Sequence, residues 1–366
     1  MSRFQAFVDL GMSATKAAFN DGVSFASYLC PSKVADLPPS ELTILKDQAD
    51  QLGTGIESGA YLQLGEQAFA LGEDAEGRPN KSTEMLRKSV LAKLRVLGAI
   101  GELAHQNRTY DLNIDIGIAL PFDEYISEQH EISEQLKAIS SFVYRGQTIN
   151  LAINHLKVLP EGAGLVQWRK MQALQQGQPA NKSYVVVIVG HRDLTFLIFR
   201  QGKPPTGEPS GTARMGYLEF LHSVSQGICK PENPYLFEAL LQGRETVSFP
   251  DQPGRVFDLN DRVRRSEDFY WEQVKHHLSE KFAYLDIPSY EILVGGGTAH
   301  TLLKTRLDKL LNSLPGGTVN WLPEIQREVC TVLNVVNPAD QIRFADCYGG
   351  SKWLAIKFGR PLEAVS

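Results

Sequence analysis

Apolar and polar positions alternate in blocks at the start of the chain. Residues 4–10 are mainly apolar, a turn of small and polar residues follows at 11–16, and residues 17–19 are apolar again. Two apolar runs on either side of a glycine-containing polar turn predict a β-hairpin. The same plan recurs at 184–199, where Gly190 separates two strongly apolar runs. We therefore expect two hairpins of similar design, far apart in the sequence.

Helical spacing of apolar residues marks two further stretches. Residues 291–294 predict a strand that leads through three glycines into an amphipathic helix at 298–314. Residues 83–105 form the second helical stretch, which includes apolar Met85, Leu86 and Val90 on one side. We interpret the basic residues between them as the solvated face of a domain helix, with a partner-binding surface as the alternative. These basic residues are Arg87, Lys88, Lys93 and Arg95.

Length and composition narrow the class of protein. A chain of 366 residues is longer than one core usually supports, so we expect two domains. The content of 43% hydrophobic and 22% charged residues is ordinary for a soluble globular protein. The net charge of −5 argues against direct binding of nucleic acid, which needs a concentrated basic face.

Cysteine spacing and hydropathy bear on the cellular compartment. The four cysteines lie far apart, with no spacing typical of a zinc site or a disulfide framework. We expect reduced thiols, as in a cytosol. The sequence shows no leader pattern at its start and no run of eighteen apolar residues, so we expect a cytoplasmic protein without a membrane span.

The turn of the first hairpin carries residues suited to a phosphate. Gly11 would take a positive φ, the hydroxyls of Ser13 and Thr15 and the freed N–H groups would face one side, and Lys16 would point at the anion. Asp9 suits a hydrated Mg²⁺ that accompanies a phosphate. An ordinary surface hairpin with solvated charges is the alternative.

The ordered set of motifs supports a family resemblance. The two glycine-cornered hairpins, the strand that leads into Gly295-Gly296-Gly297, and the Ala-Asp-x-x-Gly sequence at 345–349 resemble the nucleotide site of the actin, heat-shock-chaperone and sugar-kinase superfamily. The turn at 190–192 and the segment 211–217 resemble the bacterial and archaeal actin-like proteins of the plasmid-partition (ParM) type. The resemblance spans nearly the whole chain, and its weight lies in the order of individually degenerate motifs.

This resemblance implies an α/β, actin-like (ribonuclease H-like) two-domain fold with a nucleotide in the interdomain cleft. Domain I would comprise residues 1–160 and 345–366, with a smaller subdomain at 21–108, and domain II would comprise residues 161–344. The cofactors would be ATP, or GTP, and Mg²⁺. Glu161 would orient the water that attacks the γ-phosphate, although a carboxylate there also suits the start of a helix at 164–175.

The resemblance and the turn chemistry together assign the site residues. Asp9 and Asp193 are the candidate metal residues. In the loop at 202–216, Thr212 and Gly216 are candidate contacts near the nucleoside. The full nucleotide-binding set is Asp9, Gly11, Ser13, Thr15, Lys16, Gly190, His191, Arg192, Asp193, Thr212, Gly216, Gly295, Gly296 and Gly297.

Two positions depart from the family pattern. Ile188 stands where similar proteins place an aspartate that holds a Mg²⁺-bound water, and Asp193 in the turn is a partial substitute. We therefore expect nucleotide binding with slow hydrolysis or none. Asp346 stands where relatives often have asparagine, so we expect a different hinge contact.

The resemblance implies a polymerising cytoskeletal NTPase. Its filaments would segregate plasmid or other DNA through a separate DNA-binding adaptor, or would serve cell shape or positioning. Two alternatives remain at this point. One is a non-polymerising nucleotide-binding scaffold with little or no hydrolysis, and the other is a small-molecule kinase of the same superfamily.

Overall fold

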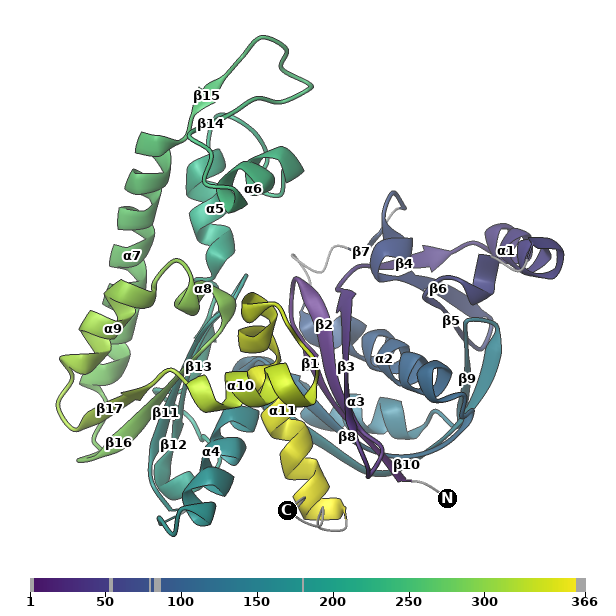
Figure 1. The fold of residues 1–366 in the computed structure, drawn as a ribbon, viewed down its shortest axis with the longest axis horizontal. Helices are drawn as coiled ribbons and strands as arrows, with labels where there is room; N and C mark the ends of the chain where they lie inside the picture. The colour runs from purple at the N-terminus through teal and green to yellow at the C-terminus, as the bar shows by residue number, and fades with distance from the viewer. Residues whose placement is uncertain (1–2, 53–54, 79, 82–86, 180, 360–366) are drawn as a thin grey trace. The chain divides into compact units, whose positions relative to one another are not determined.

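The computed structural model describes residues 3–52, 55–78, 80–81, 87–179 and 181–359, and the chain divides into two compact units. Unit 1 comprises Met1–Asn181 and Leu322–Ser366, and unit 2 comprises Lys182–Trp321. Each unit contains its own sheet (Figure 1). Each also has its own apolar core. We describe the two units separately.

Unit 1 is built on a ten-stranded mixed sheet in which β1 lies between an antiparallel and a parallel neighbour. The strand order is β3-β2-β1-β8-β10-β9-β5-β6-β4-β7. Its first five strands in this order are β3 (Phe25–Pro31), β2 (Ala14–Asn20), β1 (Arg3–Leu10), β8 (Asp111–Leu120) and β10 (Gln147–Pro160). The remaining five are β9 (Ser141–Tyr144), β5 (Tyr61–Leu64), β6 (Gln67–Leu71), β4 (Val34–Leu37) and β7 (Asn80–Lys81).

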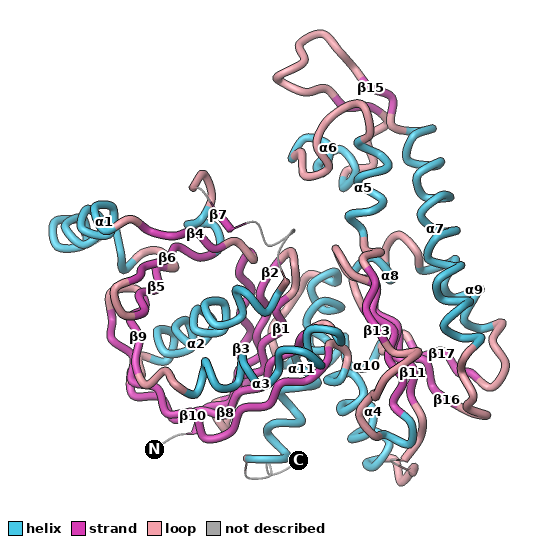
Figure 2. Tube along the Cα trace, turned by 180° about the vertical axis from the view of Figure 1, so that it is seen from behind, coloured by secondary structure: helices cyan, strands magenta, loops and turns pink. Residues whose placement is uncertain are grey.

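Helices cover both faces of the central strands of unit 1. Along β1, Val8 joins the core cluster that α2 (Ala92–Asn107) completes, whereas Phe7 contacts Gly350 of α11 (Pro338–Phe358). Successive strand residues point to opposite faces, so α2 and α11 lie on opposite sides of the sheet, as Figures 1 and 2 show. The other elements of unit 1 are α1 (Pro39–Leu52), η1 (Gly55–Glu57), η2 (Gly72–Ala75), η3 (Lys88–Leu91), α3 (Phe122–Lys137), α4 (Ala163–Gln175) and α10 (Pro323–Val332).

Unit 2 contains a five-stranded sheet in the order β13-β12-β11-β16-β17. Its hairpin strands pair antiparallel, whereas β11 and β17 both run parallel to β16. The strands are β11 (Tyr184–Val189), β12 (Leu194–Phe199), β13 (Gly211–Ala213), β16 (Tyr290–Gly295) and β17 (Gly317–Asn320). The remaining elements are η4 (Arg200–Gly202), α5 (Tyr217–Ser225), α6 (Pro234–Leu241), β14 (Thr246–Val247), β15 (Phe257–Asp258), α7 (Asn260–Ala283), α8 (Gly297–His300) and α9 (Lys304–Asn312).

The compact units divide the chain at different points from the domains expected at 160/161 and 344/345. The reason is the packing of α4 and α10 against α11 within unit 1. Glu328 of α10 accepts hydrogen bonds from Trp168 of α4 and from Tyr348 and Lys352 of α11, at 3.3, 3.1 and 2.8 Å. These three helices therefore form one packed layer.

Several sequence expectations need correction. Both expected hairpins form, but the predicted helix at 83–105 begins only at Ala92, after the η3 turn, and Met85 and Leu86 lie outside the described residues. Val90, expected on its apolar side, is 59% exposed. The helix predicted at 298–314 is two helices, α8 and α9, and the loop at 202–216 contains β13, which pairs with β12.

The expectation of a solvated basic face was wrong for two of its four residues. Lys88 and Arg95 are only 5% and 3% exposed. Both charges are buried because each has polar partners inside unit 1, Glu161 for Lys88 and the first hairpin for Arg95.

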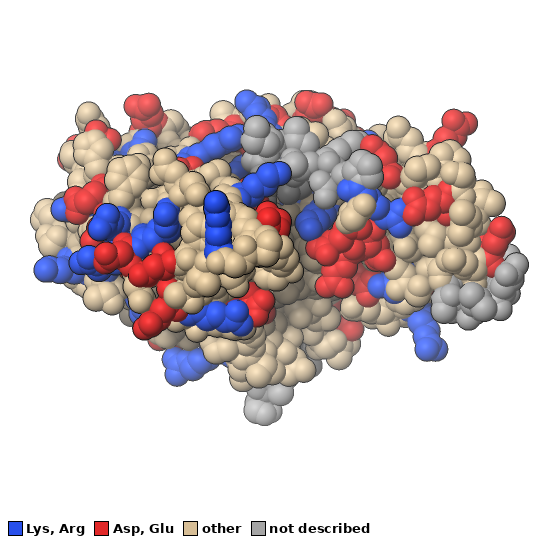
Figure 3. Space-filling model, turned by 90° about the horizontal axis from the view of Figure 1, so that it is seen from above, with Lys and Arg blue, Asp and Glu red and all other residues tan. Residues whose placement is uncertain are grey.

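Two further features concern membrane-spanning helices and surface charge. No helix in the described part of the chain combines the length and apolar character that a membrane span requires. On the face drawn in Figure 3, lysine and arginine side chains are intermixed with aspartate and glutamate.

Candidate functional site

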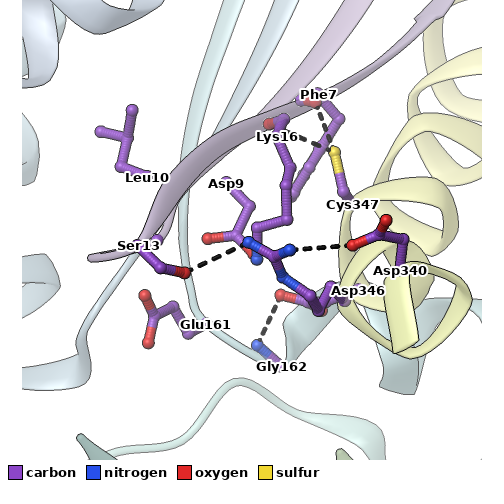
Figure 4. Close-up of polar contacts among 12 residues, drawn as sticks. Phe7, Asp9, Leu10, Ser13, Lys16, Glu161, Gly162, Asp340, Asp346 and Cys347 are labelled. Carbon is purple, nitrogen blue, oxygen red and sulfur yellow. Dashed lines mark hydrogen bonds and ion pairs between the residues drawn. The ribbon is translucent and has the colours of Figure 1, made fainter. Parts of the chain in front are cut away.

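The first hairpin places an acid directly opposite a base. In the antiparallel register of β1 and β2, Asp9 pairs with Lys16, and the Lys16 Nζ lies 2.5 Å from the Asp9 Oδ2. Both side chains are about nine-tenths buried. By strand alternation they share the α11 face with Phe7, and Figure 4 shows them together beside α11. The sequence prediction that these two residues act at one place is therefore consistent with their geometry.

The turn between the strands differs in detail from the expectation. Gly11 has no positive φ, and glycine is needed there for space, since a Cβ would lie 2.8 Å from the Ala14 carbonyl oxygen. The Ser13 hydroxyl accepts a hydrogen bond of 3.2 Å from Arg343, which also pairs with Asp340 at 2.8 Å. Ser13 is exposed at the turn.

Thr15 and Arg95 lie on the other face of the hairpin. The Arg95 guanidinium donates hydrogen bonds to the Thr15 hydroxyl and to the carbonyls of Leu10 and Gly11, at 2.8, 3.3 and 2.5 Å. Because Thr15 and Lys16 are adjacent in β2, their side chains point to opposite faces. The Thr15 hydroxyl therefore faces α2 and not the side of Lys16 and Asp9, which corrects the expectation of a shared face.

Arg95 contacts the candidate site, although the sequence analysis did not include it among the site residues. Burial lowers its pKa to about 10, and the negative charge of Asp9 partly opposes that shift. The sequence pattern could have indicated that Arg95 is buried, because it lies four residues after Leu91 and four before Ala99. Both of those residues are buried. An arginine on the buried stripe of a helix requires polar partners, and here it fixes the backbone of the turn.

Glu161 lies at the end of β10 and is paired with Lys88. Its backbone N–H donates a 2.7 Å hydrogen bond to the Leu120 carbonyl at the end of β8. Its side chain is 11% exposed and that of Lys88 only 4%, and the two form an ion pair. Sequence reasoning found the carboxylate but not its buried lysine partner.

Asp346 of α11 binds the start of α4. Its two carboxylate oxygens accept hydrogen bonds from the N–H groups of Gly162 and Leu165, at 2.8 and 3.1 Å (Figure 4). Gly164 permits this contact, because a Cβ there would lie 2.0 Å from the Asp346 carbonyl oxygen. Burial, with the nearby charges of Asp9 and Glu161, raises the pKa of Asp346 to about 7. Asp346 therefore caps the start of α4.

The second hairpin forms a tight turn. The carbonyl of Gly190 in this turn accepts hydrogen bonds from both α5 and α8. The Gly190 N–H donates to the Asp193 carbonyl at 2.9 Å. The Gly190 carbonyl accepts from the Tyr217 N–H at 3.0 Å and from the Thr298 hydroxyl at 2.8 Å. The turn, the start of α5 and the start of α8 therefore meet within unit 2.

Close backbone packing explains the glycine at the start of α5. The Gly216 N–H donates to the Arg192 carbonyl at 2.8 Å, and a Cβ on Gly216 would lie 2.4 Å from the Arg192 carbonyl carbon. The Leu218 N–H donates to the His191 carbonyl at 2.8 Å. Arg192 also pairs with Asp193, its Nε lying 2.9 Å from the nearer carboxylate oxygen, and both residues are 7% exposed.

The remaining predicted residues of unit 2 lie at the same end of the sheet as the second hairpin turn. Gly296 has φ +89°, and a Cβ would lie 2.3 Å from the Val189 carbonyl oxygen, so glycine is required there. Gly295 pairs in register with Ile188, whereas Gly297 has open space where its Cβ would be. The Thr212 hydroxyl lies 3.4 Å from that of its β-ladder partner Thr195.

The side chains of this site can be compared with those that bind Mg²⁺ together with a phosphate. Among the described residues, no group of three or more histidine, cysteine, aspartate or glutamate side chains could hold a metal ion. Mg²⁺ commonly keeps several waters and binds through one or two carboxylates plus substrate phosphates. Asp9, beside Lys16, fits such a hydrated ion accompanied by phosphate, and does not form a metal cage of protein ligands.

Comparisons with known proteins agree with this architecture. Residues 8–164 match the family model described as the N-terminal domain of actin-like proteins. The chain is similar in structure to ParM in a 15-stranded filament from Clostridium botulinum, with 16% sequence identity and a TM-score of 0.63, over 96% of this chain and 99% of that one. No curated protein matches its sequence at a significant level.

Two further similar structures contain nucleotides. An archaeal actin homologue in complex with ADP shows 16% identity and a TM-score of 0.62, over 96% of this chain and 98% of that one. ParM from Bacillus thuringiensis with ATP shows 13% identity and a TM-score of 0.58, over 97% and 98% of the two chains. The fold defined by these similarities is that of an actin-like protein. These similarities agree with the actin-like fold that the sequence motifs predict, and the structures compared include ParM proteins.

Proposed function

We propose that this protein binds ATP or GTP with Mg²⁺ and assembles into filaments. The observation that carries the proposal is the Asp9–Lys16 pair at the corner of a glycine-containing hairpin in an actin-like fold. A lysine is a point charge suited to phosphate, and an adjacent carboxylate suits the hydrated ion that accompanies it. The matched structures of an ADP complex, an ATP complex and a filament support the proposal.

The proposal assigns nucleotide-binding roles to residues of unit 1 and to residues of unit 2. Lys16 and the backbone of the first turn bind phosphate, and Asp9 binds a water of the Mg²⁺, which neutralises phosphate charge. The turn at 190–193 and the glycines at 216 and 295–297 allow close approach of the backbone to the nucleotide. Glu161 accepts a hydrogen bond from the attacking water. Ile188 supplies no carboxylate, so we expect slow hydrolysis.

Sedimentation with ATP or GTP and Mg²⁺ tests assembly, and phosphate release in the same tubes tests hydrolysis. We expect pelleting that requires nucleotide and is lost with excess EDTA. Lys16→Ala should weaken nucleotide binding at least about tenfold, because a charge-assisted hydrogen bond is lost. Lys33→Gln is the matched control, since Lys33 is 45% exposed and pairs only at the surface with Glu76. Failure of the wild-type protein to bind either nucleotide would refute the proposal.

A nucleotide-binding protein with little or no hydrolysis is the second candidate, and Ile188 favours it. Ile188→Asp introduces the carboxylate that the family resemblance implies on this strand. Faster phosphate release by this variant would show that the missing acid limits hydrolysis. An unchanged rate would assign the metal-water role to Asp193 or to another group.

The proposed cellular role is segregation of plasmid or other DNA, or a role in cell shape or positioning, in the cytoplasm. A separate DNA-binding adaptor would connect the filament to its cargo, because net charge −5 disfavours direct DNA binding. A mobility-shift assay with the purified protein should therefore show no shift at physiological salt. Fluorescence imaging of a tagged chain in cells should show linear structures, and diffuse signal at all expression levels would contradict filament assembly.

A further inference from the structure

The second hairpin, residues 184–199, has one acidic residue in its sequence, Asp193 in the turn. This carboxylate is bound by its neighbour in the chain, since the Arg192 Nε donates to both carboxylate oxygens, at 2.9 and 3.1 Å. Both side chains are 7% exposed. The negative charge of Asp193 is thus balanced inside unit 2 by an arginine of the same turn.

The row of described residues beside the turn contains no carboxylate. The register of the sheet places Ile188 opposite Thr195 and Gly295, and it places Thr195 opposite Thr212. Residues in register on neighbouring strands share a face of the sheet, so these four positions form one row. An aspartate in place of Ile188 would lie in this row, whereas Asp193 lies outside it, in the turn. Asp193 is therefore not placed where the family resemblance implies a metal-binding acid.

The backbone of the turn holds the start of α5. The carbonyls of residues 192, 190 and 191 accept hydrogen bonds from the N–H groups of residues 216, 217 and 218, at 2.8, 3.0 and 2.8 Å respectively. The first N–H groups of a helix lack partners within the helix, and no side chain of a described residue caps α5. The turn carbonyls supply three acceptors, so α5 can begin here only if the turn keeps its conformation. The Arg192–Asp193 pair lies in this same turn and joins two of its residues.

We propose that Asp193 is a positioning residue, which acts through Arg192 on the shape of the turn, and that it binds neither the metal ion nor its waters. This inference rests on the proposed nucleotide-binding function and narrows the candidate metal residues from Asp9 and Asp193 to Asp9. A guanidinium and a hydrated Mg²⁺ compete for the same carboxylate oxygens, and Arg192 already holds both oxygens of Asp193. The second hairpin then contributes backbone groups to the nucleotide site and no metal-binding acid.

The ratio of nucleotide affinity in Mg²⁺ to that in excess EDTA separates the two roles. Isothermal titration calorimetry with a non-hydrolysable ATP analogue measures this ratio on the full chain without relying on turnover. We expect Asp193→Asn to weaken binding by about tenfold in both conditions, because the turn loses its ion pair, and to leave the ratio unchanged within about twofold. Asp9→Asn should lower the ratio at least about tenfold. A ratio that falls as far in Asp193→Asn as in Asp9→Asn would overturn the inference.

The double variant Arg192→Met/Asp193→Asn tests whether Asp193 acts through Arg192. Asp193→Asn alone leaves the buried guanidinium beside a neutral amide, which destabilises the turn, whereas the double variant removes both charges. Its affinity for the analogue in Mg²⁺ should therefore return to within about threefold of the wild-type value. A residue that held a metal-bound water would show no such recovery, so a double variant as weak as Asp193→Asn would also count against the inference and overturn it.

The double variant also serves if Asp193→Asn alone fails to fold, because it leaves no buried charge in this pair. An unchanged ratio of affinities in Mg²⁺ and EDTA then supports the inference, and a fall as large as that of Asp9→Asn overturns it. Asp268→Asn is the matched control, because Asp268 pairs with Arg306 at 2.6 Å but its side chain is 61% exposed, and we expect no change. A wild-type protein that binds no nucleotide, or binds it equally well in EDTA, would instead refute the proposed function itself.

Discussion

The carboxylate of Asp346 caps helix α4 through Gly162, with its Oδ2 2.8 Å from the Gly162 nitrogen, although the two residues are 184 positions apart in the chain. The second oxygen accepts from the Leu165 N–H. Gly162 directly follows Glu161, so the cap fixes the peptide that carries the proposed water-orienting residue. A residue of the last helix thus positions a residue at the end of β10.

Removal of this cap should destabilise unit 1. We expect Asp346→Ala to lower the free energy of unfolding by about 1–2 kcal/mol, because the first N–H groups of α4 lose a side-chain acceptor. Asp346→Asn should cost less, since its amide oxygen still accepts one hydrogen bond. Urea unfolding followed by circular dichroism measures both variants. Equal stability of the alanine variant and the wild-type protein would show that the cap contributes nothing.

The same residue predicts a dependence of stability on pH. Burial raises the pKa of Asp346 to about 7 in the folded protein, from an ordinary value of 3.8. The folded protein therefore binds this proton more tightly than the unfolded chain does. The contribution of Asp346 is fully present below about pH 4 and is lost as the pH rises through 7.

The measurement is the difference in unfolding free energy between the wild-type protein and Asp346→Asn at several pH values from 4 to 8. We expect the advantage of the wild-type protein to decrease steadily over this range, because asparagine does not titrate. A constant difference would mean that the pKa of Asp346 is not raised. Other titrating groups cancel in the comparison as long as they lie outside the contact.

Arg95 should be essential for the conformation of the first hairpin. Arg95→Met leaves the Leu10 and Gly11 carbonyls and the Thr15 hydroxyl without their donor, and we expect a loss of about 3 kcal/mol in unfolding free energy. Nucleotide affinity should fall as well, because the turn that carries Lys16 loses its support. Arg87→Gln, at an exposed site, should change stability by less than about 0.5 kcal/mol. Comparable losses in both variants would contradict this account.

Two glycines of unit 2 offer a matched pair of substitutions. Gly216→Ala introduces a Cβ only 2.4 Å from the Arg192 backbone, and we expect a loss of about 1–3 kcal/mol from overpacking. Gly297→Ala meets no atom within 4 Å and should be nearly neutral. Thermal unfolding of the two variants measures the difference. A tolerated Gly216→Ala would show that α5 can move away from the hairpin turn without cost.

Local sequence patterns determined much of this protein. The two hairpins and the strand that leads into three glycines could be predicted, because strand alternation and glycine turns depend on neighbouring residues. The actin-like fold followed from the family resemblance of these motifs taken in order. Asp9 and Lys16 could be placed together for the same reason, since a tight hairpin brings residues seven positions apart into register. The need for glycine at position 296, where the backbone lies close to Val189, also followed from the local sequence motif.

Only the tertiary structure decided the partners of the buried charges. Nothing in the local sequence indicates that Lys88 pairs with Glu161, 73 positions away, or that Arg95 supports a turn 84 positions earlier. The helical pattern around these residues predicted solvated charges, because periodicity records which side of a helix a residue occupies and not what packs against it. A charge becomes buried only when the folded chain supplies its counter-charge, and that depends on contacts between distant segments.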